Sequence, residues 1–545
     1  MIQCLESTLN WLVYFSGIPE KQSMSHCVSN SKMKSQSRIF KSTVLLLVVV
    51  FFLVRLAQAQ PVHSKPNIII IYADDLGYAD VGCYGATQVK TPNIDRLANE
   101  GLMFTDGHAP AATCTPSRFA MLTGQYAWRQ KGTGIARGDA ALIIDPETMT
   151  MPDLMKKSGY QTGVVGKWHL GLGPNGGPNW NGRIKPGPLE VGFDYAFLIP
   201  ATGDRVPCVY VENHHVVNLD PKDPIQVNFK KRVGSEPIGK EHPELLKMHP
   251  SHGHDRTIIN GISRIGYMTG GKTAHWKDED MADDITSKAL KFIDRNATKP
   301  FFLFFSLHDI HVPRVPHPRF VGKTTMGPRG DAIVQTDWCV GQIMGKLDDL
   351  NIAGSTLILF TSDNGPVIDD GYQDDAVEKL GRHNPAGPLR GGKYSAFEAG
   401  TRVPWIMRWP GKIKPGKSSA LVSQVDLPSS FAHLANVEVP HDAIPDSFNV
   451  MDALLGNSKS GRDHLVEQAR TLSLRVGDWK WISPAKGARI NKNTNTELGN
   501  DPKGLLYYLG DDLGEKRELS NAYPERAREM ERLLSQIKEN KRSRP

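Results

Sequence analysis

Carboxylates and an amide stand directly after two apolar stretches of the 545-residue chain. Asp74-Asp75 follow one stretch and Asp363-Asn364 follow the other. Adjacent carboxylates repel each other unless a cation compensates their charge. Three carboxylates and one amide oxygen form a hard-oxygen ligand set suited to Ca²⁺ or Mg²⁺, whereas zinc prefers histidine and thiolate. Taken alone, Asp74-Asp75 is also compatible with a solvated acidic turn.

Cys114 stands in the segment Cys-Thr-Pro-Ser-Arg, just before an apolar helical pattern. We expect Cys114 or Thr115 to be the N-cap and Pro116 the first helical residue. The thiol would then lie at the positive end of a helix dipole, which favours anions and activated nucleophiles. Arg118, one turn further on, could hold an oxyanion. A buried, unreactive thiol is the alternative.

Strand and helix patterns alternate along the chain, which predicts an α/β fold with a large, mostly parallel sheet between helices. The expected strands are 67–73, 161–165, 301–305 and 356–360, and the expected helices are 91–101, 150–158, 281–293 and 331–350. In such sheets ligands bind beyond the carboxyl ends of the strands. All four strand ends carry chemically active residues: Asp74-Asp75, Lys167 with His169, His308 with His311, and Asp363-Asn364. This coincidence predicts an active site at that edge.

The N-terminal 59 residues read as a leader. Basic residues precede an apolar run at 43–54, and Ala57-Gln58-Ala59 has the small-x-small pattern of a signal-peptidase site. We therefore expect a secreted or periplasmic protein without a stable membrane span after processing. An uncleaved anchor is the alternative. Met33 opens a normal signal peptide, so translation from Met33 is a further hypothesis.

The remaining chain divides into a catalytic domain at 65–440 and a small α+β C-terminal subdomain at 441–545. The subdomain has strand patterns at 472–476, 479–482 and 505–509, expected to form a short antiparallel sheet, and a charged helix from 524. An insertion at about 200–280 is rich in proline, glycine and histidine. Its segments 204–205, 214–215 and 252–254 are interpreted as solvated loop or substrate contacts.

Composition excludes several classes of protein. The chain is 39% hydrophobic and 23% charged, which argues against disorder. Six basic and two acidic residues in the leader account for +4 of the net charge of +7, and no basic stripe indicates nucleic-acid binding. Four cysteines follow the leader (Cys83, Cys114, Cys208 and Cys339), without a CxxC pair. A zinc finger or a disulfide scaffold is therefore excluded, although one or two disulfides remain open.

Several segments together resemble the sulfatase family, in particular its type I, arylsulfatase-A-like branch within the alkaline phosphatase superfamily. The resemblance covers roughly residues 65–525. The matching segments are Ile71-Tyr-Ala-Asp-Asp-Leu-Gly77, Cys114-Thr-Pro-Ser-Arg118, Gly166-Lys-Trp-His-Leu-Gly171, Ser306-Leu-His-Asp-Ile-His-Val-Pro313, Thr361-Ser-Asp-Asn-Gly365, the segment 389–400 with Lys393, and the segments 474–480 and 506–509.

The resemblance implies a formylglycine-dependent sulfuric ester hydrolase. Cys114 would be converted to 3-oxoalanine (formylglycine) by a formylglycine-generating or equivalent maturation enzyme. The implied Ca²⁺ ligands, with Mg²⁺ as an alternative ion, are Asp74, Asp75, Asp363, Asn364 and an oxygen of modified Cys114. Arg118 would steady the formylglycine. The residues implied to surround the sulfate are Lys167, His169, His308, His311 and Lys393.

The chemistry agrees with these implied roles. The metal and the two lysines would neutralise the sulfate group. One hydroxyl of a hydrated aldehyde would attack sulfur, and deprotonation of the other would eject sulfate. Asp363 is the expected base for attack, His311 or Lys393 the acid for the leaving oxygen, and His169 the base for collapse.

The expected substrate is a sulfated carbohydrate or an aryl sulfate. A phosphodiesterase or phosphonate monoester hydrolase on the same fold is one alternative, because both anions are tetrahedral. A non-catalytic glycan- or anion-binding homologue is the other, if Cys114 is not modified.

Overall fold

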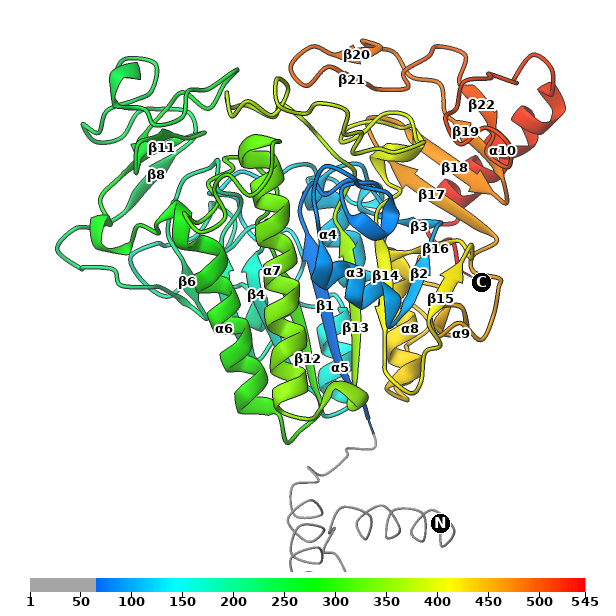
Figure 1. The fold of residues 1–545 in the computed structure, drawn as a ribbon, viewed down its shortest axis with the longest axis horizontal. Helices are drawn as coiled ribbons and strands as arrows, with labels where there is room; N and C mark the ends of the chain where they lie inside the picture. Colours follow the sequence, from blue (N-terminus) through cyan, green and yellow to red (C-terminus); the bar gives the residue numbers. More distant parts are fainter. Residues whose placement is uncertain (1–64, 545) are drawn as a thin grey trace, which may run out of the picture. The chain divides into compact units, whose positions relative to one another are not determined.

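Five parallel strands form the centre of a ten-stranded sheet in the computed structural model, which describes residues 65–544 (Figure 1). Their sequences are mostly apolar, and three adjacent strands are fully buried, as expected for strands covered on both faces. In spatial order the five are β13 (Thr356–Ser362), β1 (Asn67–Ala73), β12 (Phe301–Ser306), β4 (Gln161–Lys167) and β5 (Tyr195–Ile199).

Shorter strands extend the sheet at both edges. Antiparallel β14 (Trp405–Arg408) pairs with β13 and leads to β2 (Leu102–Phe104) and β15 (Gly416–Ser418). At the other edge, β6 (Val211–Glu212) and β7 (His215–Val216) are antiparallel. The sheet is therefore mixed but mostly parallel at its core, and the predicted fold class is confirmed.

Helices cover both faces of this sheet (Figure 1). One group of helices in mutual contact is α3 (Pro92–Asn99), α6 (Met281–Asn296) and α7 (Gly327–Asp349). The other is α4 (Cys114–Thr123), α5 (Met151–Lys157) and α8 (Leu427–Leu434), with short α9 (Met451–Leu454) beside α8. A capping box at Thr150 and Asp153 begins α5, as the sequence of that helix predicts.

The C-terminal region adds a second, fully antiparallel sheet. Its order is β17 (His464–Gln468), β18 (Leu472–Val476), β19 (Trp479–Ile482) and β22 (Leu505–Tyr508), and α10 (Pro524–Glu539) packs on it. Its apolar core also includes Ala120 of α4. The C-terminal sheet thus supports the helix that carries Cys114. The boundary at residue 440 stays a prediction.

The insertion is largely irregular. It contains only short strands: β8 (Gln226–Asn228), β9 (Ile258–Ile259), β10 (Ile262–Ser263) and β11 (Tyr267–Thr269). The remaining short pairs are β3 (Gly107–His108) with β16 (Val422–Ser423), and the hairpin β20 (Ile490–Asn491) with β21 (Thr496–Glu497). Between residues 65 and 544, no helix is both long and apolar enough to cross a bilayer.

The expected start of the Cys114 helix needs correction. Helix α4 begins at Cys114 itself and Thr113 is the N-cap, so Pro116 is the third helical residue. The Thr115 hydroxyl does not cap the helix, because it donates to the His169 carbonyl oxygen at 3.0 Å. Strand β4 also runs two residues beyond its expected end, to Lys167.

The predicted leader, its apolar run at 43–54, the cleavage site near Ala59 and the alternative start at Met33 all lie outside the described residues.

Candidate active site

The register of the central sheet brings four of the predicted segments to one edge. Ala73 of β1 lies beside Ser362 of β13, and Tyr72 lies beside Ser306 of β12. Because these strands are parallel, the residues that follow them emerge side by side. The backbone joins the segments, since Asp363 N donates to the Ala73 carbonyl at 3.1 Å and Asp74 N to the Asp309 carbonyl at 3.0 Å.

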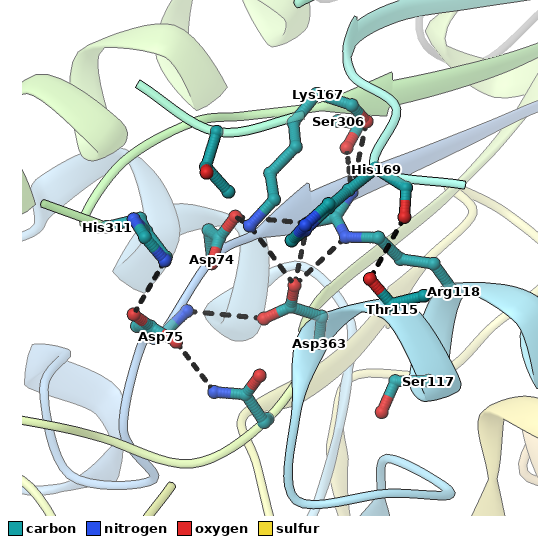
Figure 2. Close-up of polar contacts among 12 residues, drawn as sticks. Asp74, Asp75, Thr115, Ser117, Arg118, Lys167, His169, Ser306, His311 and Asp363 are labelled. Carbon is teal, nitrogen blue, oxygen red and sulfur yellow. Dashed lines mark hydrogen bonds and ion pairs between the residues drawn. The ribbon is translucent and has the colours of Figure 1, made fainter. Parts of the chain in front are cut away.

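Arg118 ties this edge to helix α4. Its Nη2 lies 2.7 Å from Asp363 Oδ2 and 3.2 Å from Asp74 Oδ2, and all three side chains are fully buried. Its Nη1 donates to Ser306 Oγ at 2.5 Å. Lys167 Nζ also forms an ion pair with Asp74 (Figure 2). Burial and the Asp363 carboxylate raise the pKa of Asp74 despite these cations.

A second lysine approaches Asp75. Lys393 Nζ lies 2.8 Å from Asp75 Oδ2 and 2.7 Å from Asp370 Oδ2. Asn364 Nδ2 donates to Asp75 Oδ1 at 2.8 Å. Burial opposes ionisation of Asp75, but Lys393 and Lys167 outweigh it and hold its pKa below the usual range. Burial lowers the pKa of Lys393, whereas Asp370 and Asp75 raise it more, so this lysine carries a proton.

The oxygen atoms at this edge fit a divalent cation. Asp74 Oδ1 and Asn364 Oδ1 are buried and have no hydrogen-bond partner within residues 65–544. Asp74, Asp75 and His311 each offer one ligand atom, all within 4.8 Å of one another. A buried acceptor without a donor is costly, and a hard cation would satisfy both orphaned oxygens. The predicted metal ligands Asp74, Asp75, Asp363 and Asn364 are thus brought together.

Cys114 is buried at the first residue of α4 and forms part of the floor of a pocket of about 190 Å³. His311 and Lys393 line the same pocket. Burial raises the pKa of the Cys114 thiol, although Lys167 and Lys393 oppose this. Desolvation of the unmodified thiol therefore opposes the ionisation that its place at the helix N-terminus favours.

The predicted histidines are buried and neutral. Burial and Lys167 hold the pKa of His169 well below its usual range, while burial, Lys393 and Lys167 do the same for His311. His169 Nε2 lies 2.9 Å from the Ala136 carbonyl oxygen, and its Nδ1 has no partner among the described residues. His311 Nε2 lies 3.8 Å from Asp75 Oδ2.

His308 occupies a different position. Its Nε2 accepts a hydrogen bond from Gly203 N at 2.9 Å, which ties it to the start of the insertion. Burial and Lys167 lower its pKa to about 3. His308 is absent from the lining of the pocket above Cys114 and borders a neighbouring small cavity instead. Its substrate-binding role stays a prediction.

Three residues of this site have a strained backbone. Asp75, His169 and Tyr394 all have left-handed φ angles of 59°, 56° and 75°. Gly166 precedes Lys167, and a Cβ there would lie 1.8 Å from the Ser306 carbonyl oxygen. Such conformations cost of order 1–3 kcal/mol each and persist where the surroundings fix them, often at functional sites.

Some site residues were not found from the sequence. Asp370 accepts from Lys393 and from the Tyr394 hydroxyl, at 2.7 and 3.0 Å. The one signal for Asp370 was its place in an Asp-Asp-Gly turn. Ser306, the Arg118 partner, is the only polar residue of its strand and lies at the strand end, which could have identified it.

The insertion supplies part of the pocket. Asp204, Arg205, His252 and His254 line it, and His254 Nε2 lies 3.0 Å from Asp204 Oδ2. His214 lies elsewhere, 3.0 Å from Glu190 Oε1. The disulfides left open by the sequence do not form, because all four cysteines between residues 65 and 544 are free.

Comparison with known proteins gives a consistent result. The sulfatase family model matches residues 66–437. An N-acetylgalactosamine-6-O-sulfatase of Bacteroides thetaiotaomicron is 56% identical over 87% of this chain and 93% of its own length. Human arylsulfatase A is 31% identical over 89% of each chain. A solved structure of a sulfatase from the glycosaminoglycan metabolism of Bacteroides thetaiotaomicron has a TM-score of 0.87, with 56% identity, and covers 87% of this chain and all of its own.

Proposed function

Because the chain belongs to the sulfatase family, and so is a hydrolase of sulfuric esters, we propose that its substrate is a 6-O-sulfated amino sugar of the N-acetylgalactosamine type. The main support is the 56% identity to an N-acetylgalactosamine-6-O-sulfatase, over 93% of that protein's length. The pocket above Cys114 supports this proposal. Its charged and amide side chains can bind sulfate and sugar hydroxyls.

Ca²⁺ and formylglycine are the proposed cofactors. Asp74, Asp75, Asp363 and Asn364 would hold the ion, which would supply positive charge to draw and polarise the sulfate group. The two orphaned oxygens support this ligand set. Conversion of Cys114 would supply two hydroxyls on one carbon after hydration, one to attack sulfur and one to release a proton.

The chain's own cations would bind the sulfate. Arg118 and Lys167 fix Asp74 and Asp363 from two sides, so the carboxylates cannot move apart when substrate enters. Lys393 lines the pocket and carries a proton, so it can neutralise sulfate oxygens. Such fixed charges stabilise a transition state more strongly than mobile water dipoles do.

The proposed reaction needs three proton transfers. Neutral His169, with Nδ1 unpartnered, can accept a proton during collapse. Asp363 is the proposed base for attack. Lys393 or His311 would donate to the leaving oxygen, and His311 would need a bound anion to raise its pKa first.

The test is a substrate panel. Purified protein containing Ca²⁺ should hydrolyse N-acetylgalactosamine 6-sulfate with a higher kcat/KM than an aryl sulfate. It should also prefer this ester to the 6-phosphate by several orders of magnitude. Comparable rates on the phosphate ester would favour the phosphoryl-transfer alternative, and hydrolysis of the aryl ester alone would refute the sugar proposal.

Mass spectrometry of the peptide containing residue 114 tests the modification. Active protein should carry an aldehyde or its hydrate at that position. An ordinary cysteine in fully active protein would refute the formylglycine mechanism. An ordinary cysteine in inactive protein would instead support the non-catalytic binding alternative.

Export is proposed on the leader sequence. The apolar run at 43–54 and the small residues Ala57 and Ala59 support cleavage and a secreted or periplasmic location. Sequencing the N-terminus of the mature protein should find it near residue 60, and recovery of an intact leader would refute the proposal.

A further inference from the structure

The hairpin β20–β21 reaches from the C-terminal region over the substrate pocket. Asn491, Asn493 and Thr494 line the same pocket as Cys114 and Lys393, although they lie about a hundred residues or more further along the chain. Figure 1 shows this hairpin extending across the top of the molecule, away from the C-terminal sheet. Part of the pocket wall is therefore contributed by a segment outside the catalytic sheet.

The hairpin presents its two faces to different spaces. Ile490 pairs with Glu497, and Asn491 with Thr496. Ile490 and Glu497 line a separate cavity of about 490 Å³, whereas Asn491 lines the substrate pocket. Neighbouring residues of a strand point to opposite faces, so Asn491 reaches the pocket because of its register.

Several contacts fix the hairpin to the loop that carries Lys393. Arg390 Nε lies 2.6 Å from Glu497 Oε2, and its Nη1 donates to the Glu515 carbonyl at 2.7 Å. Ala396 N donates to the Leu498 carbonyl at 3.1 Å. The hairpin and the Lys393 loop are thus held as one wall of the pocket.

The chemistry of this wall differs from that of the pocket floor. The remaining lining of the pocket includes charged groups, among them Lys393, Asp204 and Arg205. The hairpin contributes uncharged amides and a hydroxyl. Between residues 65 and 544 the side-chain amide of Asn493 has no hydrogen-bond partner, although its backbone N–H donates to Asn491 Oδ1 at 3.1 Å. Thr494 is buried and its hydroxyl donates to Thr496 Oγ1 at 2.9 Å. Uncharged donors and acceptors suit sugar hydroxyls and acetamido groups rather than sulfate.

We propose that Asn493 and Thr494 of the β20–β21 hairpin bind the ring of the sulfated sugar and so determine saccharide specificity, while the sulfate is held by the floor. The proposal rests on the proposed function and refines it. It assigns recognition of the sugar to the C-terminal hairpin and recognition of the anion to the sheet edge. Substitution in the hairpin should therefore weaken sugar binding without weakening binding of free sulfate.

The test compares three variants with the wild-type enzyme on N-acetylgalactosamine 6-sulfate, with inorganic sulfate as a competitive inhibitor. Asn493→Ala removes the free amide, and Thr494→Val removes the hydroxyl at nearly constant shape. Lys492→Ala is the matched control, because Lys492 lies in the same hairpin but does not line the pocket. The thermal unfolding midpoint of each protein is also measured.

Asn493→Ala and Thr494→Val should each raise KM by about threefold to tenfold, the size of one lost neutral hydrogen bond, with kcat within about twofold. The inhibition constant for inorganic sulfate should not change, and Lys492→Ala should behave as wild type. An unchanged KM in both pocket variants would overturn the proposal, and so would a parallel loss of sulfate affinity. If Thr494→Val unfolds at a lower temperature than the wild type, the KM of the Asn493→Ala variant decides the test, because Asn493 is exposed.

Failure of the hairpin proposal is distinguishable from failure of the proposed function. A wild-type enzyme without turnover of N-acetylgalactosamine 6-sulfate would refute the substrate assignment. The same variants are then compared on the sulfated monosaccharide that the wild-type enzyme hydrolyses fastest. An active wild-type enzyme with unaffected variants refutes only the hairpin.

Discussion

Two of the buried charge clusters between residues 65 and 544 differ in what surrounds them. The first is the catalytic edge, with Asp74, Asp363, Arg118 and Lys167. The second, here called the junction network, lies between the large sheet and the C-terminal sheet and consists of Asp106, His108, Glu398, Arg402, Glu467, Arg475, Lys480 and Glu515. Lys480 Nζ in this network lies 2.9 Å from Glu398, 3.3 Å from Glu467 and 3.7 Å from Glu515.

Residue types alone do not separate the two clusters. Asp106, His108 and Glu398 are as close together as a metal site requires. However, Arg475 bonds to both Asp106 and Glu398, and Arg402 pairs with both as well. The two arginines therefore supply the positive charge that a metal ion would otherwise provide. At the catalytic edge, Asp74 Oδ1 and Asn364 Oδ1 remain without donors beside an open pocket. Glu515 Oε1 in the junction network also lacks a hydrogen bond, but it faces Lys480 Nζ at 3.7 Å.

The comparison shows that unsatisfied acceptors beside a cavity mark a functional site, whereas a network closed by protein cations marks a structural one. Buried pairs of the second kind add little net stability but are costly to break. We therefore expect substitutions at the catalytic edge to affect turnover and substitutions in the junction network to affect folding.

The largest effect is expected at Cys114. Cys114→Ala should lower kcat/KM by at least about 10³-fold, because the nucleophile is lost, while the thermal midpoint changes little. Steady-state kinetics and a thermal melt measure both quantities. Substantial residual activity would contradict the assignment of Cys114 as the source of the nucleophile.

The second effect concerns the cation. Asp363→Asn should lower kcat/KM by about 10²- to 10³-fold, equivalent to the several kcal/mol that a bound metal provides. Calorimetric titration with Ca²⁺ should show binding to the wild type and much weaker binding to the variant. Asp348→Asn, on the exposed surface of α7, is the control and should bind Ca²⁺ normally. Equal Ca²⁺ binding by all three proteins would disprove the ligand assignment.

The third effect contrasts two buried lysines. Lys480→Met should destabilise the fold by about 3–5 kcal/mol, because the buried Glu467 carboxylate then keeps only His108 as a charged partner. Lys167→Met should cost less stability, because Asp74 keeps Arg118, but should lower kcat strongly. Guanidinium unfolding and kinetics on both variants measure this. Equal losses of stability would remove the distinction between the clusters.

The smallest effect is a pH dependence at His308. Its folded pKa of about 3 lies below the unfolded value near 6.5, so the unfolded chain binds the extra proton first as pH falls. The neutral ring therefore makes its full contribution to the free energy of unfolding above about pH 6.5. This contribution is lost as the pH falls from that value to about pH 3. Urea unfolding at pH 7, 6, 5 and 4 should show a shallower loss in His308→Asn, by up to about 1.4 kcal/mol per pH unit. An identical slope would contradict neutral burial.

Much of the catalytic edge was predictable because each part of it is local in sequence. Strand β1 has the expected bounds, and Asp74-Asp75 follow it directly. The residues on the side walls of the pocket are harder to predict from the sequence. Asp370 and Asn493 lie in loops without periodicity, and their function depends on which distant segment they meet. The N-cap of α4 was misplaced because Thr115 uses its hydroxyl in a long-range contact with His169.

The sequence by itself determined the elements, the ends of the central strands and the reactive residues placed there, because apolar periodicity and strand-end chemistry are properties of short segments. Only the tertiary structure decided which acidic cluster remains open to a cation and which is closed by arginine and lysine. It also decided that the β20–β21 hairpin lines the pocket. Those outcomes depend on packing between segments hundreds of residues apart, and no local pattern encodes such a distance.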